Sequence, residues 1–226
     1  MATSGTTTFA PDLTEIVEEA FERCGSELRS GYDLRTARRS LNLMFADWAN
    51  RGVNLWTLEQ GSQVLTPGTA TYNLPADTVD LLEHVTRTGS GSNQQDINLT
   101  RISVSTYSTI PNKNATGRPL QVWVERLNTP RFTLWPVPDN TQTYTVIYWR
   151  LRRIQDAGNG VNTMDMPFRF LPAMVAGLAY YLSIKLPEAL DRVPLLKSQY
   201  DEAWMLASDE DREKAAVRFV PRSFTV

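Results

Sequence analysis

The residue types that supply nucleophiles, general bases and metal ligands are scarce in this sequence. His84 is the only histidine and Cys24 the only cysteine among 226 residues, and they lie far apart. A Ser-His-Asp or Cys-His site would have to be built on His84, and a zinc site normally needs three or four His or Cys ligands. His84 stands in a strand-like run, so we expect its ring at the surface or hydrogen-bonded. Cys24 continues the apolar face of a predicted helix, which favours a buried structural thiol.

Phosphate-binding and carboxylate patterns give no specific site either. No Gly-x-x-x-x-Gly-Lys motif is present, and Gly89-Ser90-Gly91 lacks the third glycine and the helix start of a dinucleotide fingerprint. A glycosidase needs only two acids at a suitable separation, so a peptidoglycan-degrading enzyme stays an alternative. The most regularly spaced acids are Glu15, Glu18, Glu19 and Glu22. Their spacing is typical of a solvated helix face, and we predict no catalytic residue, no metal and no cofactor.

Two further side-chain types could contact a polymer. The strongest basic run is Arg150, Arg152 and Arg153. A DNA contact there is conceivable, but a strand end capped with charge is the commoner use. Three tryptophans lie in predicted β runs: Trp123, Trp135 and Trp149. They leave a carbohydrate-binding module as a second alternative, although core packing and subunit interfaces use tryptophan more often.

Composition and charge exclude several broad classes. Hydrophobic residues make up 42% of the chain and charged residues 21%, so a packed core is expected. The 23 basic and 25 acidic residues are spread evenly, which differs from the basic surface of a nucleic-acid-binding domain. The longest uncharged apolar run, 170–184, is shorter than the roughly 20 residues of a membrane span, so we expect a buried helix. One cysteine suits assembly in a reducing cytoplasm.

Helices are expected at both ends of the chain. Asp12 and Glu15 resemble a capping box, and apolar spacing predicts a helix over 13–24 that Gly25 ends. After a turn at residues 31–33, a second helix should run over 34–50. In the C-terminal part we expect a helix from Pro167 or Pro172 to residue 186. A last helix should begin between residues 187 and 194 and continue to residue 216, outrunning its core.

The middle of the chain has the short alternating runs and turn signals of β structure. Residues 63–66 and 69–74 flank Pro67-Gly68 and predict a hairpin. Further hairpins are predicted around the loops 88–93 and 128–130, a helical turn over 103–108, and a last strand over 143–152. About seven or eight strands would form a small antiparallel sandwich or barrel.

These elements predict an α+β fold in which the two chain ends form a four-helix bundle, because neither helical pair makes an adequate core alone. Residues 1–52 would supply an N-terminal arm and a helical hairpin, and 161–216 the other half of the bundle. Residues 53–160 would be an inserted β domain. Residues 217–226 would form an extended C-terminal tail that becomes ordered on a partner.

The N-terminal region resembles the head-to-tail adaptors of short-tailed bacteriophages, also called tail tubular protein A. The resemblance lies in residues 18–25 (EEAFERCG), 29–42 (RSGYDLRTARRSLN) and 48–52 (WANRG), and then in 71–75 (TYNLP). It is close over about residues 6–85 and looser beyond. These are signatures of kinship and identify no active site.

The resemblance implies a structural virion protein of the tail or neck. Such adaptors form a ring of twelve copies under the portal protein, extend the DNA channel and carry the tail nozzle (a tail tubular protein B-like partner). The near-neutral charge suits a channel through which DNA slides without specific binding, and no membrane is involved. Helices one and two would pack between neighbouring copies, since a ring needs heterologous contacts.

Two contact regions follow from the implied ring. The portal contact would lie on the C-terminal tail: Val217, Arg218, Phe219, Val220, Pro221, Arg222 and Phe224. The nozzle contact would lie on a loop of the β domain: Gly89, Ser90, Gly91, Ser92 and Asn93.

Overall fold

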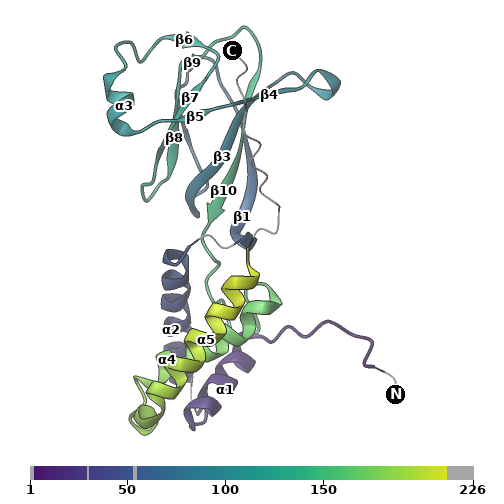
Figure 1. The fold of residues 1–226 in the computed structure, drawn as a ribbon, viewed down its shortest axis with the longest axis vertical. Coiled ribbons are helices and arrows are strands. Elements are labelled where there is room, and N and C mark those ends of the chain that lie inside the picture. Colours follow the sequence, from purple (N-terminus) through teal and green to yellow (C-terminus); the bar gives the residue numbers. More distant parts are fainter. Residues whose placement is uncertain (1–2, 30, 53–54, 213–226) are drawn as a thin grey trace, which may run out of the picture. The chain divides into compact units, whose positions relative to one another are not determined.

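The computed structural model describes residues 3–29, 31–52 and 55–212, and it divides the chain into two compact units. Met1–Trp56 and Gln155–Val226 make up one unit, here called the helical unit, and Thr57–Ile154 the other, the β unit. The helices α1, α2, α4 and α5 belong to the helical unit, and the numbered strands to the β unit (Figure 1). The fold is α+β.

Helix α1 (Leu13–Cys24) begins and ends where its local chemistry predicts. The Asp12 carboxylate accepts the Glu15 N–H at 2.9 Å, and the Glu15 carboxylate accepts the Asp12 N–H at 3.0 Å, so the predicted capping box is confirmed. Gly25 follows in the left-handed region with φ 76°, which costs glycine little. The buried side of the helix consists of Leu13, Ile16, Val17, Ala20, Phe21 and Cys24.

Helix α2 (Gly31–Asn50) begins earlier than predicted, because Gly31, Tyr32 and Asp33 form its first turn rather than a turn before it. Asp33 lies where a carboxylate interacts favourably with the helix dipole, and its side chain accepts the N–H of Arg29 at 3.3 Å. The buried positions agree with the predicted apolar spacing and add a serine: Ala37, Ser40, Leu41, Met44, Phe45 and Trp48.

Helix α4 (Leu171–Ser183) is the most buried helix of the helical unit and packs against α1, α2 and α5 (Figure 1). A short 3-10 turn, Phe168–Phe170, leads into it, and another, Pro187–Arg192, leads from it to α5 (Val193–Glu210). Gly177 allows the close approach, since a Cβ there would lie 2.4 Å from Met44 Sδ and 2.8 Å from Tyr200 Cε2. A helix apolar on nearly every side needs several neighbours, as predicted.

Helix α5 ends at Glu210, short of the predicted residue 216. The next residue, Asp211, is buried, accepts the Leu55 N–H at 3.0 Å and forms an ion pair with Arg169. These two contacts hold the chain after α5 against the helical unit. The polar sequence predicts a solvated continuation of the helix at this point instead. The predicted tail, 217–226, lies outside the described residues.

The β unit holds two four-stranded sheets and a two-stranded one. The first sheet has the order β1 (Leu58–Val64), β10 (Tyr144–Arg152), β3 (Thr78–Thr88), β4 (Gln95–Asn98). The second has the order β2 (Thr71–Asn73), β8 (Arg131–Trp135), β7 (Gln121–Glu125), β5 (Thr100–Arg101). β6 (Thr116–Gly117) pairs with β9 (Val137–Pro138). Residues of both four-stranded sheets bury one core, including Leu81, Val122, Phe132 and Val146.

Strand pairing departs from the prediction in two ways. The hairpin expected around Pro67-Gly68 is wrong, because β1 pairs with β10 and β2 with β8. The pairing is also mixed rather than wholly antiparallel, since β5 is parallel to β7 and β6 to β9. The hairpins β3–β4 and β7–β8 are confirmed, as is a helical turn, α3 (Val104–Thr109). The remaining short elements are the 3-10 turns Leu55–Thr57 and Gly91–Asn93.

Candidate assembly surfaces

His84 lies in β3 with its ring in the core of the β unit. Its side chain is buried, and neither ring nitrogen has a hydrogen-bond partner among the described residues. The expectation of a surface-exposed or hydrogen-bonded ring is therefore wrong. Desolvation, reinforced by the charge of Arg101, lowers the pKa of His84 below its ordinary 6.5. No carboxylate in the described part of the chain accepts a hydrogen bond from the ring as the third member of a triad would, so the geometry is that of a core residue.

Cys24 is the buried thiol that its place on α1 predicts. It is 1% exposed, and its Sγ donates to the Ala179 carbonyl of α4 at 3.2 Å. Burial raises its pKa to about 11, so the reactive thiolate is disfavoured. Among the residues that the structure describes, no three His, Cys, Asp or Glu side chains lie close enough together to hold a metal ion.

The basic run of β10 is neutralised within the β unit. Arg150 pairs with Glu59 at 2.7 Å and with Asp77 at 2.6 Å, and Arg152 pairs with Glu59 at 2.6 Å. The hydrogen bond from Arg150 holds the pKa of the Asp77 carboxyl below its usual range. Both guanidinium groups are therefore committed to carboxylates, and only Arg153 is an exposed member of the run.

The three tryptophans of the β runs do not form a row. Trp123 stacks on Tyr107 with ring centroids 5.0 Å apart, and Trp135 donates its indole N–H to the Asn112 carbonyl at 3.0 Å. Trp149 is 45% exposed but lies in the other four-stranded sheet. A flat platform for a sugar needs neighbouring exposed rings on one face, and these three side chains do not provide it.

The segment assigned to the nozzle is the tip of the β3–β4 hairpin. Its five residues, Gly89 to Asn93, are all exposed, and an Arg87–Asp96 ion pair of 2.8 Å closes its base. Gly89 has φ 70°, and a Cβ there would lie 2.3 Å from the Asn93 carbonyl oxygen. The tip is therefore a solvent-exposed loop whose base is held by an ion pair. The residues assigned to the portal, Val217 to Phe224, lie outside the described residues.

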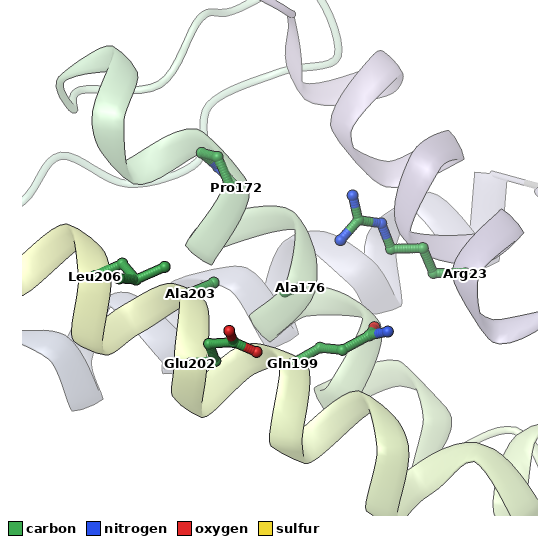
Figure 2. A pocket seen from close by; sticks show the side chains of 7 residues that line it. All are labelled: Arg23, Pro172, Ala176, Gln199, Glu202, Ala203 and Leu206. Atoms are coloured by element: carbon green, nitrogen blue, oxygen red, sulfur yellow. The ribbon is translucent and has the colours of Figure 1, made fainter.

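A groove that the sequence pattern did not predict runs along α1, α4 and α5. It consists of two adjoining pockets of about 450 and 390 Å³ that share Arg23 and Pro172. In the first, α5 contributes one wall, α4 the floor and α1 the far edge (Figure 2). Its lining is Arg23, Pro172, Ala176, Gln199, Glu202, Ala203 and Leu206. We name the two pockets together the α1/α4/α5 groove.

The second pocket of the groove is more apolar and carries two exposed aromatic rings. Phe9 and Phe168 make an edge-to-face pair with centroids 6.4 Å apart, although they are 72% and 69% exposed. Glu15, and Glu19 with its 2.8 Å ion pair to Arg23, also border this pocket. Apolar surface of this kind, rimmed by acids, marks an interaction site more often than plain solvent-facing surface.

Comparisons with known proteins agree with a role in assembly. None of the helices in the described part of the chain has the length and apolarity to cross a membrane. A search of curated proteins found no match. The model of the family described as SU10 adaptor protein matches residues 11–221, which include most of both units. The chain therefore belongs to the SU10 adaptor protein family and is a structural adaptor protein of a bacteriophage.

Proposed function

We propose that this adaptor forms a ring, of twelve copies as in tail tubular protein A, below the portal in the neck of a short-tailed phage. The ring extends the DNA channel and carries the tail nozzle. The family match over residues 11–221 carries this proposal, because a single adaptor function then covers both units. In this scheme the chain ends form a four-helix bundle, the β unit a sandwich, and the copies assemble in the host cytoplasm.

Charge supports passage of DNA without capture. The net charge is −2, and the strongest basic run gives two of its three guanidinium groups to Glu59 and Asp77. Each phosphate contact by a free lysine or arginine would add salt-dependent affinity for DNA. A channel with few such contacts lets the genome slide. Among the described residues, His84 and Cys24 are buried and no group of side chains could hold a metal ion, and this favours a structural role over an enzymatic one.

The portal and the nozzle would bind at two different places in the chain. The portal would bind residues 217–226, with Phe219, Pro221 and Phe224 as anchors and Arg218 and Arg222 as polar contacts. The nozzle would bind the exposed β3–β4 tip, Gly89 to Asn93. Aromatic anchors and arginine are the side chains that commonly dominate binding energy at protein interfaces.

Pull-down of purified portal and nozzle proteins tests both contacts. Deleting residues 217–226 should abolish portal binding while the circular dichroism of the chain is retained. The variant with Ser90→Arg and Ser92→Arg should lose nozzle binding and keep portal binding. The matched control places arginine at Asn128 and Thr129, which are exposed in the β7–β8 loop. Normal portal binding by the truncated chain would refute the portal assignment.

A further inference from the structure

We propose that the α1/α4/α5 groove of one copy receives the exposed side of helix α2 from a second copy. This contact would repeat head to tail around the ring, so the inference rests on the proposed ring and names its self-interface. Helix α2 is chosen as the partner because the two surfaces are complementary. The groove is apolar and acidic, and the exposed side of α2 is apolar and basic.

The groove contributes the negative charge to the proposed contact. Three carboxylates border it, Glu15, Glu19 and Glu202, against a single cation, Arg23, which is already paired with Glu19. Beside them, every exposed position of α1 is a glutamate. Between the acids lie apolar side chains, among them Phe168 and Leu206, which are 69% and 62% exposed. A partner for this surface must bring apolar bulk together with positive charge.

Helix α2 presents such a surface between Tyr32 and Leu43. Its exposed side chains recur every three or four residues: Tyr32, Arg35, Arg39, Leu43, Ala46 and Asn50. Tyr32 is 69% and Leu43 57% exposed, and the basic side chains of Arg35 and Arg39 are exposed between them. Lys185, which is exposed, lies at the edge of this stripe rather than on it, because its Nζ donates to Ser40 Oγ on the buried side of α2 at 2.6 Å.

The groove and the α2 stripe lie on different sides of α4. Helix α2 packs where α4 carries Gly177, whose position is filled by Met44, whereas the groove opens over Pro172 and Ala176. Neighbouring residues on a helix point about 100° apart, so Ala176 faces the groove while Gly177 faces Met44 of α2 and Tyr200 of α5. One copy can therefore offer its groove to one neighbour and its α2 stripe to another. Two different complementary faces on one subunit are the requirement for a heterologous, ring-forming contact.

A charge-exchange experiment tests this contact on the full chain. The first variant carries Arg35→Glu and Arg39→Glu, and the second carries Glu19→Arg and Glu202→Arg. Each alone should lose self-association by about 100-fold or more, because like charges then meet across the contact. An equimolar mixture should recover it, since each variant's stripe again meets a groove of opposite charge. Sedimentation velocity, with and without portal, gives the oligomer size.

The control reverses two exposed basic residues of the β unit, Arg118→Glu and Arg153→Glu, which belong neither to the groove nor to the exposed side of α2. This control should assemble as the wild type does. The α2-to-groove contact is refuted if the first variant still forms rings, or if the mixture fails to recover them. The proposed function would still stand in either case, provided that the wild-type chain forms rings. Association that depends on residues 213–226 and not on α2 would assign the groove to the chain's own C-terminal segment. A wild-type chain that never assembles on the portal contradicts both the inference and the proposed function.

Discussion

The hydrogen bond between Trp48 and Tyr200 joins α2 to α5 at the centre of the helical unit. Trp48 Nε1 donates to the Tyr200 hydroxyl at 2.8 Å, and the two residues are 0% and 2% exposed. The Tyr200 ring also lies against Gly177 of α4 and stacks on Tyr180. Replacing Tyr200 with phenylalanine keeps this packing and removes only the hydroxyl.

The cost of this change follows from burial. Trp48 would keep an indole N–H with no acceptor and no access to water, and an unsatisfied buried donor costs about 1–3 kcal/mol. We therefore expect Tyr200→Phe to lower the free energy of unfolding by about 2 kcal/mol. For a chain of this size that corresponds to a fall of roughly 4–8 °C in the midpoint temperature.

Urea unfolding followed by circular dichroism at a helical wavelength measures this loss, because the signal reports mainly on the helical unit. Tyr181→Phe is the matched control: Tyr181 is on the same helix as Tyr180 but only partly buried, and a surface change of this kind costs less than about 0.5 kcal/mol. Equal stability of Tyr200→Phe and wild type, or an equal loss in both variants, would refute the reasoning.

Three further predictions concern the groups discounted as catalytic. His84 titrates below 6.5 in the fold, so stability should be intact above about pH 6.5 and lost as the pH falls from there through the lowered folded-state pKa; a His84→Leu variant should lack this acid loss in pH-dependent urea unfolding. Cys24 has its pKa raised from 9.0 to about 11, so stability should be intact below pH 9 and lost as the pH rises through 11, a loss that Cys24→Ala should remove. The purified chain should clear no turbidity from a cell-wall suspension, and clearing that carboxylate substitutions abolish would show an enzyme instead.

The parts of the fold that sequence predicted well are those fixed by near neighbours. The capping box of Asp12 and Glu15, the stop at Gly25 and the β3–β4 hairpin each depend on residues a few positions apart. The hairpin expected around Pro67-Gly68 failed because β1 finds its partner in β10, far along the chain. Turn chemistry shows where a chain reverses and does not show which strand a run will pair with.

The candidate surfaces show the same division. The exposed tip at residues 89–93 could be predicted because it has no apolar anchor. The α1/α4/α5 groove could not, since its walls come from residues as distant as Arg23 and Leu206. The sequence predicts too long a last helix because Asp211 resembles one more solvated acid. In the structure its carboxylate instead pairs with Arg169 and accepts the Leu55 N–H.

Electron microscopy of the wild-type chain mixed with its portal tests the proposed function most directly. The account predicts a closed ring of adaptor copies on the tail side of the portal, continuing its channel, and no such density with the chain that lacks residues 217–226. Single adaptor molecules scattered on the portal, or no adaptor density at all, would contradict it.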